Sequence, residues 1–235
     1  MKFIKKLLIK ILIIILIALL IFVGMGYGKY KKAITEMPLD IKVEKIRNKE
    51  SFTKLEDLPK IYKDAVIAAE DHRFYRHCGI DVISIGRAIV NNIKQGKLAE
   101  GGSTITQQLI KNMYFEGERS LLRKVAEVFL TFDIEKNYEK DEILELYVNS
   151  IYYGDGYYTV KDACKGYFNK EVQDMNAYEA TLLAGIPNAP SIYSLSNSPK
   201  LAHQRQKQVV YKMLENGYIS QEEANDILEY KEKNK

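Results

Sequence analysis

The hydrophobic pattern divides the chain into an apolar N-terminal segment and a long region of helical periodicity. Residues 7–28, LLIKILIIILIALLIFVGMGYG, contain Lys10 as their single charged residue. A helix needs roughly 20 apolar residues to span a bilayer, so this segment predicts a transmembrane anchor. A cleaved signal peptide is the alternative, but its apolar core spans about 7 to 15 residues and ends at an A-x-A-like site, which does not follow Val23. We therefore expect a retained anchor.

Beyond the anchor, one short alternating stretch precedes the helical patterns. Residues 40–47, DIKVEKIR, alternate apolar and polar side chains, which favours a short strand or an extended linker. In LPKIYKDAVIAAEDHRF, Pro59 suits a first helical turn, and apolar residues recur on one face up to Glu70. The stretch VISIGRAIVNNIKQG predicts a second helix that ends near Gly96.

The rest of the chain carries further helical stripes and capping signals. Two segments, SLLRKVAEVFLTFDIEK and KDEILELYVNSIY, place apolar residues at helical spacing. The stripes are Leu122, Val125, Phe129 and Phe132 in the first segment, and Ile143, Leu144, Tyr147, Val148 and Ile151 in the second. Later helices are marked by Asn176 with Glu179, by Pro199 and Gly217, and by Ser220 with Glu223. Nearly every segment is helical, so the predicted fold class is mainly α.

Composition limits the number of domains and the kinds of partner. The chain has 235 residues, and about 205 follow the anchor, which suits one ordinary domain. Its net charge of +4 comes from 35 basic and 31 acidic residues. This excess suits work beside anionic lipid headgroups and is too small to indicate nucleic-acid binding. Cys78 and Cys164 form no C-x-x-C pattern, which excludes a disulfide framework or structural zinc site, and we expect two unpaired core thiols.

The stretch AEGGSTITQQLIKN, residues 99–112, combines two glycines, hydroxyl side chains and a glutamine pair at the start of a predicted helix. Backbone N–H groups at a helix start carry partial positive charge and bind anions such as phosphate. The alternative is an ordinary capped surface helix, because Thr104 and Gln107 fit the capping-box pattern. Ser103, Gln108 and, one turn further on, Lys111 would add donors and charge to an anion site.

Two further clusters carry groups suited to catalysis. Glu70 precedes Asp71 and His77 in AAEDHRFYRHCGID, at the point where a partly buried carboxylate would serve as a general base. An exposed Glu-Asp pair at a helix end is the alternative. In ERSLLRKVAE, Arg123 and Glu127 are four residues apart, which by itself indicates a surface ion pair. The cations of this segment are Arg119, Arg123 and Lys124.

Taken together, these motifs resemble a known family. In chain order, EDHRFYRHCGID, GGSTITQQLIKN, RKVAE and ILELYVNSIYYG are similar to the motifs of the peptidoglycan glycosyltransferase family, the transglycosylase module of bifunctional penicillin-binding proteins. The resemblance continues through YFNK, EATLLAGIPNAPSIYS and RQKQVVYKMLENG, and it covers residues 57–217. Four motifs in consistent order are far more specific than one. The chain departs from the pattern at Cys78, at Thr159, where glycine is common, and at Arg205, where two adjacent arginines are frequent.

The resemblance implies a lysozyme-like, all-helical globular domain behind an N-terminal transmembrane helix. We expect a cytoplasmic tail at 1–6, the anchor at 7–28, a linker at 29–50, the glycosyltransferase domain at 51–218, and a C-terminal helix with a charged tail at 219–235. With no transpeptidase domain, the chain looks like the monofunctional form. Lysines before the anchor favour an inside N-terminus, and the family works on the extracytoplasmic side of the cytoplasmic membrane. The segment IDVISIGRAIVNNIKQGKL would dip into the membrane surface with Lys94 and Lys97 near headgroups, or form an ordinary core helix.

The implied reaction is the polymerisation of lipid II. A glycan chain on undecaprenyl diphosphate is transferred with inversion to the 4-hydroxyl of lipid II, and undecaprenyl diphosphate is released. By motif position Glu70 is the general base, and Glu127 is the second carboxylate, which orients cations or the leaving sugar. Inverting glycosidases hold such groups roughly 6.5 to 9.5 Å apart. The implied substrate-binding residues are Asp71, Phe74, His77, Ser103, Thr104, Gln107, Gln108, Lys111, Arg119, Arg123 and Lys124.

The resemblance implies no required cofactor and no dedicated metal site, and a divalent cation such as Mg²⁺ is compatible with the diphosphate. The expected partners are lipid II, the growing lipid-linked strand, the membrane and other cell-wall synthesis proteins, with no nucleic acid. Two other functions stay open. One is a lysozyme-like hydrolase or lytic transglycosylase, which would not need the diphosphate motif. The other is a non-enzymatic, membrane-anchored helical scaffold, in which Glu70 would be dispensable.

Overall fold

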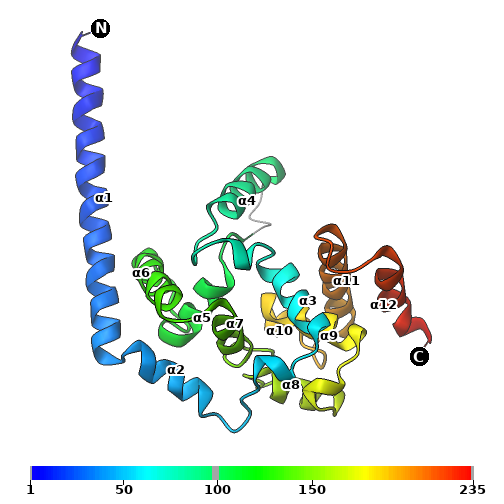
Figure 1. Cartoon of the computed structure of the whole chain (residues 1–235). Helices are drawn as coiled ribbons and strands as arrows, with labels where there is room; N and C mark the ends of the chain where they lie inside the picture. The colour runs from blue at the N-terminus through cyan, green and yellow to red at the C-terminus, as the bar shows by residue number, and fades with distance from the viewer. Residues whose placement is uncertain (1, 97–100, 234–235) are drawn as a thin grey trace.

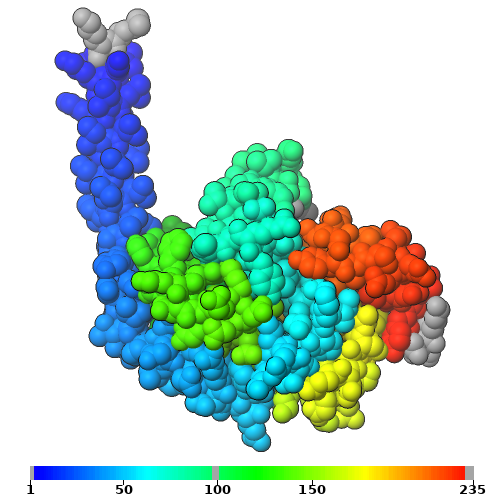
Figure 2. All heavy atoms as spheres, in the orientation of Figure 1, coloured from blue at the N-terminus to red at the C-terminus, as the bar shows by residue number. Residues whose placement is uncertain are grey.

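The computed structural model describes residues 2–96 and 101–233, which form helices joined by turns with no strand among them. The mainly α fold class is therefore confirmed. Figure 1 shows α1 standing at one side of the packed domain, and Figure 2 shows its upper part clear of the other helices. The α-helices are α1 (Lys2–Glu36), α2 (Leu39–Arg47), α3 (Lys60–Glu70), α4 (Val82–Gln95), α5 (Ile105–Tyr114), α6 (Leu121–Asn137), α7 (Lys140–Val148), α8 (Val160–Phe168), α9 (Ala177–Gly185), α10 (Pro190–Tyr193), α11 (Pro199–Glu215) and α12 (Gln221–Lys233).

Helix α1 runs without interruption from the predicted anchor into the domain. Its residues 3–21 are all exposed, and among the described residues it is the helix long and apolar enough to cross a membrane. From Phe22 onward one face becomes covered, and Tyr30 is only 8% exposed. The helix continues to Glu36, so the first part of the segment expected to be a linker is helical and packs on the domain.

The strand or extended linker expected at residues 40–47 is wrong. These residues lie in α2, where Val43 and Ile46 are 1% and 6% exposed. Residues three apart share one helix face, so both side chains pack into the core, where α2 contacts α7. A short stretch that alternates apolar and polar residues can also hold two apolar residues three positions apart, so it fits a helix as well as a strand. The packing of Val43 and Ile46 into the core selects the helix.

The core lies between two groups of helices. Helices α3, α9 and α11 pack together, and α5 contacts both α6 and α7. The stripe predicted on α7 is confirmed, because its five residues are at most 3% exposed. The capping pairs also form, since Asn176 accepts from the backbone of Glu179 and Ser220 from that of Glu223. The starts predicted at Asn176 and Ser220 therefore have the side chain that stabilises them.

Helix α6 is packed on two sides, which its sequence stripe did not show. The predicted stripe includes Phe132, which is 48% exposed. Val125 and Phe129, also from the stripe, lie against α1. The fully buried face is a different one and comprises Ala126, Glu127, Leu130, Thr131 and Ile134. Apolar periodicity missed this face because it includes a carboxylate and a hydroxyl.

Helix α4 projects from the domain with its apolar side chains uncovered. Ala88 is the buried residue of this helix, so the expectation of an ordinary core helix is wrong. Figure 1 shows α4 rising toward the same side as the N-terminal part of α1. Lys97, predicted with Lys94 to contact headgroups, lies outside the described residues. The exposed apolar residues are Val82, Ile83, Ile89, Val90 and Ile93.

The two cysteines differ in environment. Both are free, with Cys164 buried and Cys78 exposed. Burial raises the pKa of the Cys164 thiol to about 11, so this thiol stays protonated. The expectation of two core thiols holds for Cys164 and is wrong for Cys78, which lies in the exposed turn between α3 and α4.

Candidate active site

A cleft of about 1090 Å³ opens where α3 ends and α5 and α6 begin, with α11 on its other wall. It brings together ten of the predicted site residues, which come from segments far apart in the sequence. Phe74 is 0% exposed and lies in the core, and Arg119 is exposed outside the cleft lining. His77 also lies outside this lining. The residues brought together are Glu70, Asp71, Ser103, Thr104, Gln107, Gln108, Lys111, Arg123, Lys124 and Glu127.

Glu70 is the last residue of α3, and buried Ala68 and Ala69 hold this turn in the core. The Glu70 side chain is 7% exposed, so the alternative of an exposed Glu-Asp pair is wrong. Its Oε2 accepts a hydrogen bond from Gln108 Nε2 at 2.8 Å. Its Oε1 is buried without a hydrogen-bond partner, 3.6 Å from Arg205 Nη2. Because Oε1 is ion-paired with Arg205 but accepts no hydrogen bond, it retains the capacity to accept a proton from a bound hydroxyl.

The orientation of Glu70 is fixed through a second side chain. Tyr147 OH, 0% exposed, donates to Gln108 Oε1 at 3.2 Å, which leaves the amide nitrogen of Gln108 to donate to Glu70. Burial, and next the charge of Glu70, raise the pKa of Tyr147 well above its ordinary value. The phenol therefore remains a donor. The sequence placed Tyr147 in the core, but no sequence signal indicated this link to the carboxylate.

Asp71 ties together the segments around the cleft. Its carboxylate contacts His77 Nε2 at 3.0 Å and accepts from the backbone N–H of Ile105 at 3.1 Å. The His77 side chain is 6% exposed, and its ring lies 6.3 Å from that of Phe74. Asp71, Phe74 and His77 were predicted to bind substrate. Asp71 lines the cleft and joins the end of α3 to the start of α5, whereas Phe74 and His77 lie outside the lining and support Asp71 from within. That these residues bind substrate stays a prediction.

The start of α5 is a formed capping box. Thr104 accepts from the backbone of Gln107, whose side chain accepts from the backbone of Thr104. Thr104 also donates to the carbonyl of Gly79 at 2.6 Å. The capping box is thus confirmed, but the helix is not an ordinary surface helix, because Thr104 and Gln107 are 2% and 3% exposed and both line the cleft. A Cβ on Gly102 would lie 3.2 Å from Ile85, so a larger residue here would press on α4.

A buried carboxylate organises the cations at the start of α6. Glu127 is 1% exposed and forms ion pairs with Arg123 and Lys124. Lys124 Nζ also donates to Ser103 Oγ at 3.1 Å, which connects α6 to the segment before α5. The expectation of a mere surface ion pair is therefore wrong. Lys111 lines the same cleft from α5. We call Lys111, Arg123 and Lys124 the cation cradle.

Comparison with known proteins shows the family of the chain. The sequence profile of the family described as Transglycosylase matches residues 39–214. The chain belongs to the transglycosylase family. The family resemblance of the four motifs is thereby confirmed.

Relatives of this transglycosylase are much longer than the chain. It is 48% identical over 177 residues to penicillin-binding protein 1A of Neisseria flavescens, which covers 75% of the chain and 22% of that relative. It is 45% identical over 170 residues to penicillin-binding protein 1F of Bacillus subtilis, which covers 72% of the chain and 24% of that relative. The chain thus spans less than a quarter of the length of these curated relatives. The crystal structure of penicillin-binding protein 1A from Haemophilus influenzae matches 75% of this chain and 17% of that one, with 26% identity and a TM-score of 0.46.

Helix α11 gives the transglycosylase cleft a wall that motif reasoning did not assign. Arg205, 8% exposed, donates from Nη1 to Gln208 Oε1 at 3.0 Å, and its Nε is buried without a partner. Lys212 Nζ donates to the carbonyl of Ala69 at 2.6 Å, next to Glu70. Arg205, Gln208 and Lys212 recur at i, i+3 and i+7, which is one helix face. That polar stripe was the available signal.

One group of potential metal ligands lies at the cleft, with two of its three residues in the lining. Ligand atoms of Asp71, His77 and Asp81 lie within 4.8 Å of one another. However, Asp81 Oδ2 accepts from Arg73 Nε at 3.0 Å and from Ser84 Oγ at 2.6 Å. A metal ion would have to displace the Arg73 guanidinium, so this cluster does not fit one.

His72 adds a neutral donor or acceptor to the cleft lining. Arg87 Nη1 donates to His72 Nε2 at 3.4 Å. Burial first, and the charge of Arg87 second, lower the pKa of His72 below its ordinary value. The imidazole is therefore neutral at neutral pH and adds no charge to the cation cradle.

Proposed function

We propose that this transglycosylase polymerises lipid II into peptidoglycan strands. The observation that carries the proposal is that one cleft holds both Glu70, whose Oε1 is ion-paired with Arg205 but accepts no hydrogen bond, and the cation cradle. A sugar hydroxyl needs a base, whereas a departing diphosphate needs positive charge. Similarity to penicillin-binding proteins supports a cell-wall substrate.

In the proposed reaction Glu70 acts as the general base. Glu70 Oε1 accepts the proton of the 4-hydroxyl of lipid II while that oxygen bonds to the anomeric carbon of the donor strand. The bond from this carbon to the diphosphate oxygen breaks with its electron pair, so undecaprenyl diphosphate leaves and the configuration inverts. Glu70 then returns the proton to solvent. General-base catalysis of this kind contributes about 10² to 10⁴-fold.

The cation cradle stabilises the charge that develops on the diphosphate. Lys111, Arg123 and Lys124 supply it, and Glu127 holds the last two in place through its ion pairs. For inversion we predict that the carboxyl groups of Glu70 and Glu127 lie roughly 6.5 to 9.5 Å apart. No cofactor is part of the proposal. Because Glu127 is already paired, a divalent cation such as Mg²⁺ would be carried by the diphosphate oxygens rather than by a protein ligand set.

We propose that α1 anchors the chain and that the catalytic domain lies on the extracytoplasmic side. The exposed residues 3–21 number nineteen and extend about 28 Å at 1.5 Å each, which matches a hydrocarbon core of about 30 Å. The uncovered apolar side chains of α4 would enter the membrane surface. The proposed partners are the membrane, lipid II, the growing strand and other cell-wall synthesis proteins.

The two alternative functions predict a different site. A hydrolase or lytic transglycosylase acting on finished glycan releases no diphosphate and has no use for three convergent cations. A scaffold has no use for a buried carboxylate oxygen that accepts no hydrogen bond, because burying a polar group without its hydrogen bond lowers stability. Both features are present in the cleft, so polymerisation is the better supported function.

Glu70→Gln tests the proposal. Gln keeps the size of the side chain but cannot take up the proton, so we expect polymerisation of lipid II by the purified full chain to fall by about 10² to 10⁴-fold with the melting temperature unchanged. Asp64→Asn is the matched control, because Asp64 lies on the same helix outside the cleft lining. It should retain activity within about twofold.

The wild type should produce long, moenomycin-sensitive strands from lipid II. Cleavage of finished glycan without polymerisation would favour the hydrolase. A Glu70→Gln variant that polymerises at the wild-type rate would reject Glu70 as the base.

A further inference from the structure

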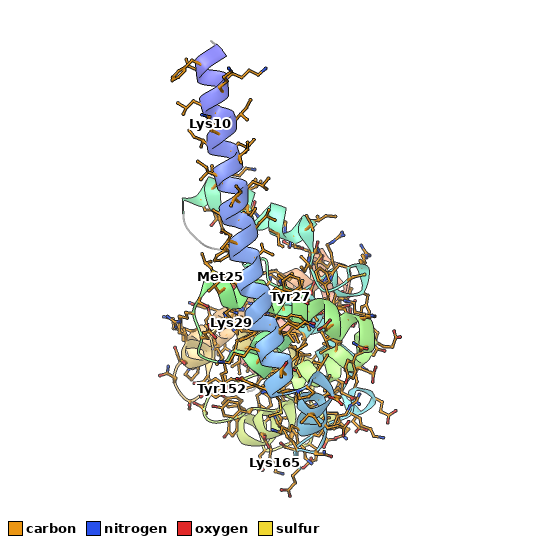
Figure 3. All side chains as sticks on the ribbon, turned by 90° about the vertical axis from the view of Figure 1, so that its left-hand side faces the viewer. Lys10, Met25, Tyr27, Lys29, Tyr152 and Lys165 are labelled. Carbon is orange, nitrogen blue, oxygen red and sulfur yellow. The ribbon has the colours of Figure 1, made fainter. Side chains whose placement is uncertain are left out.

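The last turns of α1 are built against α6. Side chains of α1 lose exposure at positions 22, 26, 29, 30, 33 and 34, whereas residues 3–21 stay exposed. This spacing of three and four marks one helix face. In Figure 3, Lys10 lies well clear of the domain, and Tyr27 and Lys29 lie beside it. One face of α1 is therefore packed on the domain from the point where the exposed segment ends.

Of the glycines in α1, Gly26 lies nearest to α6. A Cβ at Gly26 would lie closer than 3.0 Å to the side chain of Val125 on α6. Val125 is short and β-branched and has little freedom to move aside, so any larger residue at position 26 must displace the helices. Cβ atoms at Gly24 and Gly28 would meet nothing within 4 Å. The close approach thus requires glycine at position 26 and not at the neighbouring two.

Polar and aromatic contacts extend the packing of α1 along α6. The Tyr30 ring lies 5.5 Å from that of Phe129, and its hydroxyl donates to Asp133 Oδ2 at 2.7 Å. Lys29 pairs with Glu118, just before α6, at 2.9 Å. The contacts reach from one end of α6 to beyond its middle. They therefore fix both the position of α6 and its rotation about its own axis.

The opposite side of α6 carries part of the active site. Val125 and Phe129 face α1, whereas Arg123, Lys124 and Glu127 line the cleft. We infer that the packing of Gly26 against Val125 positions the two α6 cations of the cradle, Arg123 and Lys124, relative to Glu70, so that Gly26 of α1 is a positioning residue for catalysis. This inference rests on the proposed function, because it concerns the same reaction.

The physical reason is the sensitivity of charge stabilisation to geometry. A shift of about 1 Å in a group that stabilises the transition state can cost about 10²-fold in rate. Both proposed substrates are lipid-linked, so their diphosphates lie at the membrane surface. A continuous helix seated on α6 holds the cradle at one height above the bilayer, which a flexible tether would not do.

Gly26→Leu tests the inference against two matched controls on the same helix. Gly24→Leu and Gly28→Leu add the same side chain where the structure has open space. All three variants keep the apolar helix and should float equally with vesicles. In vesicles supplied with lipid II, we expect kcat of Gly26→Leu to fall by about tenfold or more, and both controls to stay within about twofold. Weaker membrane capture alone would instead raise KM and leave kcat unchanged.

A compensating pair keeps the test valid if Gly26→Leu unfolds the protein. Gly26→Ala should lower kcat, and adding Val125→Gly should restore most of it, because Val125 Cβ itself would lie 2.5 Å from the new Cβ and only glycine removes it; a double-mutant cycle measures the recovery. Equal kcat in Gly26→Leu and Gly28→Leu, or no recovery in the double variant, would overturn the inference while wild-type polymerisation persists. A wild type that does not polymerise lipid II would overturn the proposed function and this inference with it.

Discussion

Tyr147→Phe should separate the orientation of the general base from the stability of the core. The substitution removes one oxygen from a side chain that is 0% exposed, and with it the donor to Gln108 Oε1 at 3.2 Å. The Gln108 amide is then free to turn its oxygen toward Glu70 Oε2, which repels it. Glu70 itself stays in place at the end of α3, so the base is less well oriented but still present.

The expected effect follows from the strength of that hydrogen bond. A neutral intramolecular hydrogen bond contributes about 1 kcal/mol, which corresponds to about fivefold in rate. We therefore expect kcat for lipid II polymerisation to fall about fivefold, far less than for Glu70→Gln. The free energy of unfolding should fall by about 1 kcal/mol, because the same bond stabilises the folded chain.

Tyr62→Phe is the matched control for Tyr147→Phe. Tyr62 is also 0% exposed, and its hydroxyl lies 2.7 Å from that of Tyr153. The loss of its hydroxyl should lower the free energy of unfolding by a similar amount and leave kcat unchanged. The measurements are initial rates at saturating lipid II and chemical denaturation of the detergent-solubilised chain. Equal kcat values for the two variants would refute a role of Tyr147 in orienting Glu70.

Two further predictions concern the cradle and the start of α4. Lys111→Ala should lower kcat/KM by about tenfold or more, because Lys111 lines the cleft. Arg119→Ala should change kcat/KM by about twofold at most, because Arg119 is exposed outside the lining. Similar losses of kcat/KM in the two variants would contradict this placement. Burial alone would raise the pKa of Asp81, but hydrogen bonds from Ser84 and the charge of Arg73 outweigh it and hold this pKa below its ordinary value of 3.8. The stability that ionised Asp81 contributes is therefore complete above pH 3.8 and lost as the pH falls through the lower folded-state value. We expect Asp81→Asn to lower the free energy of unfolding by about 2 kcal/mol at pH 7 and the difference to shrink below pH 4, and a difference independent of pH would reject this explanation.

Local signals in the sequence were reliable where a short segment contains its own stabilising contacts. The capping box of Thr104 and Gln107 and the stop at Gly96 formed as predicted, because caps and left-handed glycines act over a few residues. The motifs also indicated which side chains would meet in the cleft. Signals that depend on a distant neighbour were less reliable. Residues 40–47 alternate like a strand but are helical, since Val43 and Ile46 find a buried surface on the domain.

The amino-acid sequence by itself determined the helical class, the apolar N-terminal helix and the family, and it named the proposed base and all three residues of the cation cradle, because these follow from periodicity and from ordered motifs. Only the tertiary structure decided that Phe74 and His77 support the site from within, that Arg119 lies outside it, and that α11 brings Arg205 within 3.6 Å of Glu70. It also decided that the anchor helix packs on α6. Motifs specify residue types, but whether a side chain faces the cleft, the core or another helix depends on segments far away in the sequence, and packing alone brings those segments together.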